Sequence, residues 1–443
     1  MTFLIDFLGC KVNSYEVEAL ANTFFANGYK LFDPRLDSFP DIIVVNTCAV
    51  TETSVSKDKK LIKKYRKQYP NAILVVMGCY SQYKYNYIAN ELGANIVLGT
   101  SNRTKIYDYI QEFLKNKETI IVHEDNKTSR VYERMNISKY ISNTRAYVKI
   151  QDGCDNFCSY CLIPYIRGRS RSRLPSDILS EIEDLINNGY KEIILTGVDM
   201  ASYGLDFDNK ITLSDLLEMI LSKFDNLYRL RISSLETSLI DDKFLELLKQ
   251  FDNFANHLHI PLQSGSKKVI KAMNRKYDLP EFKEKVFKIR TIRPDISITT
   301  DVIVGFPGEN EDDFLESYQT CKEIHFSKIH VFPFSSREGT VASKLSDQVD
   351  PKIKKDRVHR LLKLSDELEE EYYAKFYGKQ IEFLFEEYDE KLQGFKGHSS
   401  NYLQAYIKTD QNLKNKVKKI VFTKENCIKI WQCQKNYLSM VIT

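Results

Sequence analysis

Short apolar runs alternate with stretches of helical spacing along most of this chain, and this alternation constrains the fold more than any other feature. Three runs near the start have the character of strands: Phe3–Phe7, Asp41–Val45 and Ala72–Met77. A stretch of helical spacing follows each of them: Ser14–Asn27, Ser54–Gln68 and Tyr85–Leu92. Strands that are buried on both faces and joined by helices form parallel sheets. We therefore predict a small parallel α/β domain at the N-terminus.

The alternation resumes at Arg145. Six further runs have strand character: Ala146–Gln151, Glu192–Thr196, Arg229–Ser234, His257–Leu262, Ser297–Val304 and Lys328–Pro333. Helical patterns lie between them, such as Ile178–Asn188, Leu213–Phe224 and Asp312–Ile324. Six consecutive β/α units predict a partial (β/α)6 barrel. Ligands of such barrels lie at the C-terminal ends of the strands, so a functional site is expected there.

The last part of the chain has a different pattern. Lys352–Tyr377 is charged, with apolar residues at helical spacing, and predicts a long connecting helix. Short alternating runs after Gly378 predict a small β-barrel. These runs are Ile381–Glu386, Leu403–Ile407, Lys419–Phe422 and Ile428–Gln432. The predicted α/β protein thus has an N-terminal domain at 1–116, a polar linker at 117–139, a barrel domain at 140–371 and a C-terminal β domain at 374–443.

Composition excludes several classes of protein. The 443 residues carry 64 basic and 60 acidic side chains, so the net charge of +4 does not by itself indicate a polyanionic partner. Apolar residues make up 43% of the chain, which is enough to build globular cores. The N-terminus has no basic leader, and no apolar run approaches the ~20 residues of a membrane helix. We expect a cytoplasmic protein without a membrane segment, whose nine cysteines are ligands, catalysts or core residues rather than disulfides.

The sharpest signal is the segment Gly153–Cys161, in which Cys154, Cys158 and Cys161 follow a Cys-x3-Cys-x2-Cys spacing. Thiolates hold iron, and a short loop lets three of them converge on one iron–sulfur cluster. A zinc loop is the alternative, but zinc needs a fourth Cys or His, and none lies within ten residues of the loop. Three thiols leave a fourth iron without a protein ligand. We therefore predict a cluster that is open to a substrate or cofactor.

Three other cysteines each follow the end of one N-terminal strand: Cys10, Cys48 and Cys79. The C-terminal ends of parallel strands share one edge of a sheet, so residues far apart in sequence can meet there. Buried structural cysteines are the alternative, because free cysteines are common in protein cores. The repeated placement favours a second cluster. The remaining cysteines lack this placement, and we expect Cys321 in a helix core and Cys427 and Cys433 in strands.

The cysteine loop, with the aromatic Tyr160 before its last cysteine, resembles the radical S-adenosylmethionine (SAM) superfamily. The resemblance implies a [4Fe–4S] cluster whose open iron is chelated by the amino and carboxylate groups of SAM. It also implies three SAM contacts: Tyr160, Gly197 after the second barrel strand and Gly305 after the fifth. Glu236, at the end of the third strand, is either a ligand of SAM or substrate or one half of a surface ion pair.

Two cysteine triads in this order resemble the methylthiotransferase family over nearly the whole chain, including a C-terminal nucleic-acid-binding domain called TRAM. The segment Leu8–Glu16 is most similar to the MtaB type, because the MiaB type usually has Gln-Met-Asn after its first cysteine. Further matching segments are Pro164–Gly168, Arg171–Arg173, His257–Ser266, Met273–Arg275 and, for the TRAM turn, Gly397–Tyr402. The resemblance implies two [4Fe–4S] clusters and SAM as the cofactors.

The resemblance also implies a reaction. One electron cleaves SAM to methionine and a 5′-deoxyadenosyl radical, which abstracts hydrogen from C2 of an adenosine. A methylated sulfur from the N-terminal cluster is then transferred to that carbon, and a second SAM supplies the methyl group. The expected substrate is N6-threonylcarbamoyladenosine at tRNA position 37, next to the anticodon. The expected partners are tRNA and an electron donor such as flavodoxin or ferredoxin, and we expect a monomer.

Three alternatives to this function remain open from the sequence. N6-isopentenyladenosine in tRNA is a close alternative substrate, and an aspartate of a ribosomal protein is a more distant one. A zinc-containing RNA-binding protein without catalysis is the alternative outside enzymes. Iron content and SAM cleavage would separate this last alternative from the enzyme.

Basic residues of the C-terminal domain indicate a surface for RNA. Lysines outnumber acids after Glu390, and aromatic residues for base stacking lie among them. The expected phosphate contacts are Lys416, Lys418 and Lys419. The other members of this set are Lys408, Lys414, Lys424, Lys429, Lys435, Phe395, Tyr402, Tyr406 and Trp431. The alternative is compositional, because the chain favours Lys throughout.

Two further groups of polar residues have competing interpretations. Arg167, Arg169, Arg171 and Arg173 alternate with small residues. We expect Arg167, Arg171 and Arg173 to contact phosphate, the SAM carboxylate, the substrate or the protein's own structure, with a solvated loop as the alternative. A threonylcarbamoyl carboxylate needs a cationic partner when buried, and Lys11 beside Cys10, or an arginine of this loop, is expected to supply it.

His257 and His259 point to one face of a predicted strand, because strand side chains alternate. A metal site needs a third ligand, and the sequence shows none. We therefore expect these histidines to pack in the barrel interior or at its rim.

Overall fold

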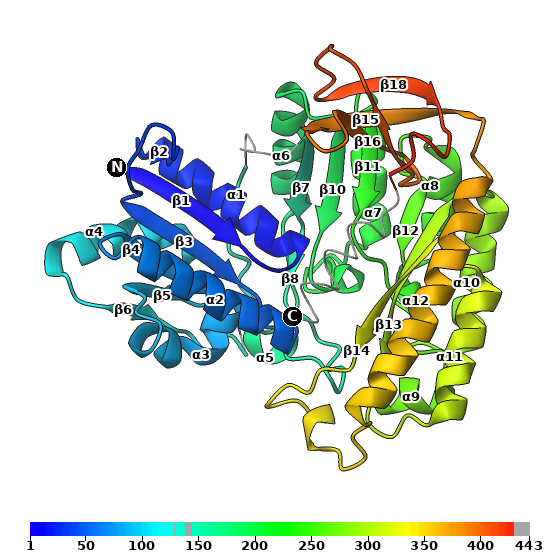
Figure 1. Ribbon diagram of the computed structural model, residues 1–443, viewed down its shortest axis with the longest axis horizontal. Coiled ribbons are helices and arrows are strands. Elements are labelled where there is room, and N and C mark those ends of the chain that lie inside the picture. The colour runs from blue at the N-terminus through cyan, green and yellow to red at the C-terminus, as the bar shows by residue number, and fades with distance from the viewer. Residues whose placement is uncertain (128, 138–143, 429–443) are drawn as a thin grey trace.

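The N-terminal domain is a parallel sheet with helices on both faces (Figure 1). The computed structural model describes residues 1–127, 129–137 and 144–428. The sheet order is β2-β1-β3-β4-β5-β6. Its strands are β1 Thr2–Phe7, β2 Lys30–Leu31, β3 Ile42–Thr47, β4 Ile73–Gly78, β5 Ile96–Leu98 and β6 Ile120–Val122. The three predicted strands are β1, β3 and β4, and the strands that the sequence did not reveal are only two or three residues long.

The strand β6 corrects one boundary. It pairs with β5 inside the stretch that we expected to be linker, so the N-terminal sheet extends to Val122. Its three residues are too few to show a period in the sequence. The helices of this domain are α1 Lys11–Ala26, α2 Glu52–Gln68, α3 Cys79–Asn90 and α4 Ile106–Asn116.

Helix α1 lies between the N-terminal sheet and the barrel (Figure 1). Ten consecutive residues, Val12–Ala21, are buried, including Glu16 and Glu18. A helix that is buried on all sides contacts neighbours on every face. The two domains therefore share α1, and one hydrophobic core contains residues of both.

The second domain is the predicted partial barrel. Its six strands are β7 Arg145–Lys149, β10 Glu192–Thr196, β11 Arg229–Ile232, β12 His257–His259, β13 Ser297–Val304 and β14 Lys328–Pro333. They form two parallel sheets, β7-β10-β11 and β12-β13-β14. The sheets meet where Leu230 bridges to Phe254 and the Leu235 N–H donates to the His259 carbonyl at 2.8 Å. All six predicted strands are confirmed.

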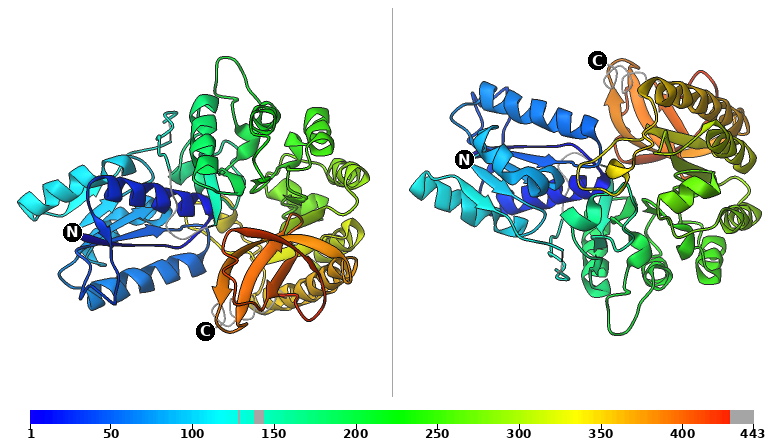
Figure 2. Two further views of the ribbon diagram at one scale, coloured as in Figure 1. Left: turned by 90° about the horizontal axis from the view of Figure 1, so that it is seen from above. Right: turned by 90° about the horizontal axis from the view of Figure 1, so that it is seen from below.

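Helices surround the outside of the barrel (Figure 2). They are α6 Pro175–Asn187, α7 Leu213–Lys223, α8 Asp242–Gln250, α9 Lys267–Ala272, α10 Leu279–Ile292 and α11 Glu311–Ile324. Short 3-10 helices are η1 Arg103–Lys105, η2 Met200–Ser202, η3 Thr237–Leu239 and η4 Ala342–Lys344. Cys321 is fully buried on α11, as predicted. No helix in the described part of the chain has both the length and the apolar character to span a membrane.

Helix α12, Pro351–Ala374, packs along β14 and leads to the C-terminal domain, as predicted. This domain is a four-stranded antiparallel sheet of order β17-β16-β15-β18. Its strands are β15 Gln380–Asp389, β16 Gly394–Ser399, β17 Gln404–Ile407 and β18 Lys416–Val421. The sequence did not predict β16, because two glycines and a histidine interrupt its apolar pattern. Of the predicted strand Ile428–Gln432, all but Ile428 lies outside the described residues, as do Trp431, Cys433 and Lys435.

The C-terminal domain packs on the N-terminal ends of the barrel strands, opposite the ends that carry the cysteine loop (Figures 1 and 2). Arg145 on β7 donates to Glu386 at 2.7 Å, and His398 contacts Glu192 on β10 at 2.9 Å. Both barrel residues are the first of their strands. This domain therefore closes one end of the barrel, and the other end stays available for a site.

Candidate functional site

The three N-terminal cysteines lie at the C-terminal ends of three adjacent strands. Cys10 follows β1 and caps α1, Cys48 follows β3, and Cys79 is the first residue of α3 after β4. In the sheet, β1 pairs with β3 and β3 with β4, so the three loops are neighbours. The structure therefore brings the predicted N-terminal triad to one edge, with Cys10 exposed and Cys48 and Cys79 buried.

Two glycines let these loops approach closely. Gly9 has a φ of +127°, and a Cβ there would lie 3.1 Å from the Cβ of Cys48. Gly78 has a φ of +101°, and its Cβ would lie 2.2 Å from the Asn46 side-chain oxygen. Only glycine combines this backbone conformation with such close contact.

Asn13, which the sequence did not single out beyond its motif, ties two of the loops together. Its amide nitrogen donates to the carbonyls of Leu8 at 2.9 Å and Thr47 at 3.1 Å. Its Oδ1 lies 3.7 Å from the Cys10 thiol and accepts from Arg167 at 3.2 Å. A buried amide that is bonded on both sides fixes the positions of the neighbouring cysteines.

Two thiols of this triad have raised pKa values, so they become thiolates only when a metal binds them. Burial and the neighbouring Cys79 raise the pKa of Cys48 to about 12. Burial also raises the pKa of Cys79, although Arg167 donates to its sulfur at 3.2 Å and opposes the shift. Iron deprotonates such thiols, and a cationic donor to sulfur stabilises the resulting thiolate. The donor set therefore fits an iron–sulfur cluster.

The second triad lies on one loop whose base is a short hairpin. Strand β8 Gln151–Asp152 pairs with β9 Arg171–Ser172, and the loop between them contains the short helix α5 Ile163–Ile166. The Cys154 N–H donates to the Gly168 carbonyl at 3.1 Å, and the Cys161 N–H donates to the Cys158 carbonyl at 3.0 Å. Barrel loops also hold it, because the Ser159 N–H donates to the Met273 carbonyl at 3.0 Å and the Ala342 N–H donates to the Ser159 carbonyl at 2.8 Å.

Each thiol of this loop has a polar neighbour. The Cys154 thiol lies 3.4 Å from Asp199, and Arg275 lies 3.6 Å from the sulfur of Cys158. The Ile163 N–H donates to the sulfur of Cys161 at 3.5 Å. Cys79 is among the groups that, after burial, raise the pKa of Cys161 to about 12, so the two triads lie near each other.

Gln151 connects the cysteine loop to the predicted SAM-binding turn at Gly197. Its Oε1 accepts from the N–H groups of Val198 at 3.0 Å and Asp199 at 2.8 Å, and its Nε2 donates to the Gly153 carbonyl at 2.8 Å. A Cβ at Gly197 would lie 3.1 Å from Gln151 Oε1. Nothing in the sequence pointed to Gln151, because its role depends on loops that are distant along the chain.

The other predicted SAM contacts also surround the loop. Tyr160 packs against a cluster that contains Phe306 and Phe334. The Gly305 N–H donates to both oxygens of Glu309 at 3.0 Å, so this amide is already bonded. Contacts of Tyr160, Gly197 and Gly305 with SAM stay predictions.

Glu236 forms the ion pair that was one of its two interpretations. Its partner is Arg275, the same side chain that contacts the Cys158 sulfur. The pair therefore lies beside the cysteine loop rather than on a remote surface, and a contact of Glu236 with SAM or substrate stays a prediction.

The three loop arginines are not contacts for RNA phosphates, which corrects one expectation. Arg167, Arg171 and Arg173 are at most 3% exposed. Arg171 donates to the carbonyls of Arg167 at 2.7 Å and Arg169 at 3.2 Å, and Arg173 pairs with Glu181. Alternation with small residues does not reveal whether a loop is buried, so both the phosphate contact and the solvated loop were wrong, and contacts with SAM or substrate stay predictions.

Arg167 belongs to a buried ion network that joins the two domains. It donates to Glu16 on α1 at 2.9 Å and to Asp152 on β8 at 3.0 Å. Lys149 contacts the same two carboxylates, and Arg103 pairs with Glu16 at 2.5 Å. Burial disfavours the Glu16 carboxylate, yet these cations hold its pKa well below the ordinary value. Breaking such a pair costs ~3–5 kcal/mol, because it leaves a buried charge alone.

The lysines differ in their environment. Lys416, Lys418 and Lys419 are exposed on β18, an edge strand of the C-terminal sheet. Lys11 is partly exposed at the start of α1, and no described residue gives it a hydrogen bond or ion pair. Burial opposes ionisation of Asp301 in the barrel, and Lys11 is among the cations that still hold its pKa below the ordinary value. Lys11 therefore lies near the barrel interior.

The two histidines of β12 have different neighbours. His257 is buried against the ring of Tyr402 from the C-terminal domain, with ring centroids 4.4 Å apart, which confirms interior packing. His259 lies near Asp301 on β13 and His330 on β14, and their ligand atoms are within 4.8 Å of one another. The expectation that His259 lacks further metal-ligating partners was wrong, because strand pairing brings together residues that are far apart in sequence.

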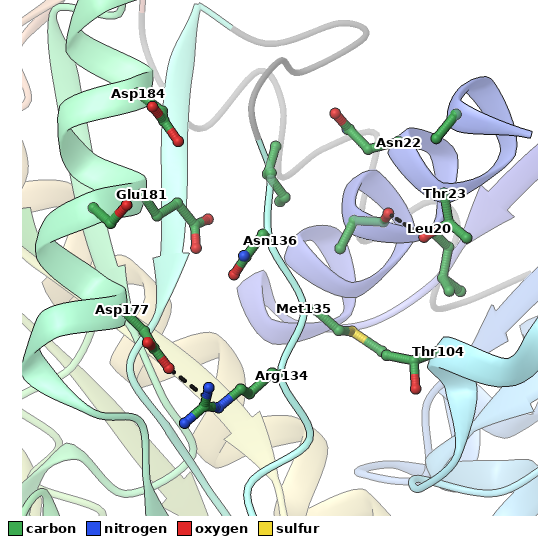
Figure 3. Close-up of a pocket in the computed structure, with 14 residues that line it drawn as sticks. Leu20, Asn22, Thr23, Thr104, Arg134, Met135, Asn136, Asp177, Glu181 and Asp184 are labelled. Atoms are coloured by element: carbon green, nitrogen blue, oxygen red, sulfur yellow. Dashed lines mark hydrogen bonds and ion pairs between the residues drawn. The ribbon is translucent and has the colours of Figure 1, made fainter.

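A separate cavity of about 480 Å³ lies between α1, residues 134–137 and α6 (Figure 3). In Figure 3 the side chain of Arg134 points toward Asp177 of α6. The two residues form an ion pair at 3.2 Å. Neither cysteine triad lines this cavity. It is therefore distinct from the cysteine site.

Comparisons with known proteins agree with this geometry. Residues 148–321 match the Radical SAM superfamily, and residues 2–99 match a family described as uncharacterized protein family UPF0004. In Bacillus subtilis (strain 168), the protein named threonylcarbamoyladenosine tRNA methylthiotransferase MtaB is 40% identical, with 94% of this chain and 92% of that protein covered.

Two further relatives differ in their named product. A protein of Thermotoga maritima with the same name is 37% identical, with 92% of this chain and 90% of that protein covered. A tRNA-2-methylthio-N(6)-dimethylallyladenosine synthase of Thermoanaerobacter sp. (strain X514) is also 37% identical, with 92% and 85% covered.

A solved structure with a related fold is the radical SAM methyltransferase TsrM of Kitasatospora setae. Its TM-score is 0.57 at 14% identity, with 77% of each chain covered, so it supports the fold alone. SAM and two [4Fe–4S] clusters are the cofactors of this enzyme, and the two cysteine triads are the residues that fit the clusters. The chain belongs to the family of radical SAM tRNA methylthiotransferases.

Proposed function

We propose that this enzyme methylthiolates C2 of N6-threonylcarbamoyladenosine at position 37 of tRNA. The relatives at 40% and 37% identity that carry this substrate in their names support the proposal. A relative named for the dimethylallyl product is also 37% identical, so identity separates the two substrates only weakly.

The observation that carries the proposal is the polar interior beside Lys11. Lys11 has no hydrogen bond or ion pair among the described residues. Its charge lowers the pKa values of Asp301, His330, His257 and Tyr402, and burial opposes this shift at Asp301 and Tyr402. A threonylcarbamoyl group carries a carboxylate, a hydroxyl and a urea-like amide, which need such partners when buried. An isopentenyl group would be favoured by an apolar wall instead.

Because the loop arginines belong to the ion network, Lys11 is the favoured partner for the substrate carboxylate. Of the four cations proposed for the substrate carboxylate, Lys11 is the one whose charge no carboxylate in the described part of the chain already pairs. A site that hydrogen-bonds one substrate rejects an analogue that leaves its polar groups unpaired.

The test is nucleoside mass spectrometry of tRNA from a host that lacks both native enzymes and expresses this protein. We expect the methylthio form of threonylcarbamoyladenosine and none of isopentenyladenosine. Lys11→Met should lower that product while SAM cleavage persists, and Lys30→Met, on an exposed edge strand, is the matched control. Formation of only the isopentenyl product would overturn the proposal.

The remaining parts of the proposal concern partners. Exposed lysines of β18 support tRNA binding by the C-terminal domain, through phosphate contacts. We propose an electron donor of the flavodoxin or ferredoxin type, a monomeric enzyme and a cytoplasmic location.

A further inference from the structure

A set of two histidines and one carboxylate lies inside the barrel near Lys11, and neither cysteine triad includes it. His259 ends β12, Asp301 lies on β13 and His330 lies on β14. Their ligand atoms lie within 4.8 Å of one another, and each residue is partly buried. The set comes from three adjacent parallel strands, so its position is fixed by the barrel rather than by a loop.

Strand register explains why these side chains converge. Asp301 pairs directly with His330, and His259 pairs with Thr299, two residues before Asp301 on the same face. The rings of His259 and His330 are 5.8 Å apart between centroids. A metal ion that bridges two imidazoles requires a separation of this order, because each metal–nitrogen bond is ~2.0–2.1 Å.

Thr299 orients one of the histidines. Its hydroxyl lies 2.9 Å from His259 Nδ1, which leaves Nε2 directed toward the Asp301 carboxylate at 3.4 Å. A hydrogen bond to one ring nitrogen that directs the other to the metal is the usual support of a histidine ligand. The same hydroxyl lies 3.1 Å from His257 Nε2, so it is anchored on both sides.

The donor atoms of the set also suit a cation. They are two imidazole nitrogens and one carboxylate oxygen, which are donor types that bind transition-metal ions. Among the described residues, no other side chain hydrogen-bonds the ring of His330 or the Asp301 carboxylate.

We propose that His259, Asp301 and His330 bind one divalent transition-metal ion, separate from both iron–sulfur clusters. Two imidazoles and one carboxylate are a known ligand set for zinc and for ferrous iron, and they leave coordination positions open. An oxygen donor such as a carboxylate or a carbonyl is the class of ligand that would complete the site.

The experiment uses the full chain with both clusters reconstituted, so that the six cysteines are occupied. Zinc is titrated in, and iron and zinc are counted together by mass spectrometry. We expect one zinc per chain beyond the cluster iron. His330→Gln and Asp301→Asn should each weaken zinc binding at least about tenfold with iron unchanged. His123→Gln, at an exposed histidine outside the barrel, is the matched control and should retain zinc.

Two further variants test the details of the site. Thr299→Val should weaken zinc binding ~10–100-fold, whereas Thr299→Ser keeps the hydroxyl and should retain affinity. Lys11→Met removes a nearby repelling charge and should tighten binding. Zinc uptake that is absent in the parent protein, or unchanged in both His330→Gln and Asp301→Asn, would overturn the proposal.

Discussion

The two cysteine triads each bring three thiols together, but they do so through different parts of the fold. Cys154, Cys158 and Cys161 lie within eight residues on one loop. Backbone hydrogen bonds within the loop and a hairpin of two-residue strands at its base help to hold it. Cys10, Cys48 and Cys79 are separated by 38 and 31 residues and meet only after three strands have paired. The first triad depends on local geometry, and the second depends on a whole sheet and on the neighbouring domain.

The difference predicts where each site is vulnerable. The local triad is supported by bonds within its loop and by barrel residues that include Gln151, Asp199 and Met273. The distributed triad is supported by two tightly packed glycines, by Asn13 and by Arg167 from the other domain. Changes far from the N-terminal cysteines should therefore disturb their cluster, whereas the loop cluster should tolerate them.

Removing either triad gives the largest effect. Replacing Cys154, Cys158 and Cys161 by Ala should leave one cluster and abolish SAM cleavage. Replacing Cys10, Cys48 and Cys79 should leave one cluster that still cleaves SAM but forms no methylthio product. Iron content, 5′-deoxyadenosine and modified nucleoside are the measurements. Methylthio product from the second variant would show that the N-terminal triad has another role.

Arg167→Met should affect the N-terminal cluster and leave the function of the loop cluster intact. The change leaves Glu16 without one buried partner and removes the donor to the Cys79 sulfur, which should lower the free energy of unfolding by ~3–5 kcal/mol. We expect loss of iron from the N-terminal site while SAM cleavage persists. Arg169→Met is the control in the same loop, because its side chain is 40% exposed and contacts Asp155 and the Phe157 ring rather than Glu16 or Cys79. Equal iron loss in both variants would contradict the prediction.

Gly78→Ala tests the close packing of the strand ends. Its φ of +101° and the 2.2 Å approach to Asn46 should cost ~1–3 kcal/mol and reduce iron at the N-terminal site. Gly28→Ala is the control, because it also places alanine at a positive φ, +79°, but with no atom within 4 Å of the new Cβ. Thermal unfolding of both variants separates the contact from the strain. A similar melting temperature in the two would mean that close packing at Gly78 contributes nothing.

The smallest effect on either cluster is expected from the C-terminal strand. Changing Lys416, Lys418 and Lys419 to Glu should leave iron and SAM cleavage unaltered. The salt dependence of tRNA binding should flatten by ~0.9 in slope for each phosphate that is no longer neutralised. The same change at Lys352, Lys355 and Lys363, exposed on α12, is the control. An unaltered slope would place the phosphate-binding residues elsewhere.

Most of the fold was predictable because long strands and helices have a periodic pattern of apolar residues in the sequence. All six barrel strands, α12 and the three central strands of the N-terminal sheet have such a pattern. The short β2, β5 and β6 do not, because two or three residues carry no period. Strand β16 was hidden because Gly394 and Gly397 break its apolar pattern.

The site shows the same limit. The spacing of the loop cysteines and the position of the other three after strand ends are local features. They were sufficient to predict both cysteine triads. The roles of Asn13 and Gln151, and the proximity of His259 to His330, depend on contacts across loops and strands. The spacing of residues along the sequence does not predict such contacts. The burial of Arg167 was misjudged for the same reason, since its partner Glu16 lies 151 residues away.

The shared ion network has a consequence for how the protein is made. Glu16 leaves the ribosome early, whereas Arg167 is synthesised 151 residues later, a delay of ~8–30 s at ordinary elongation rates. Until then, Glu16 has Arg103 as a partner but lacks Arg167, which is also the donor to the Cys79 sulfur. The chain therefore completes its first cysteine site only after it has produced the three cysteines of its second.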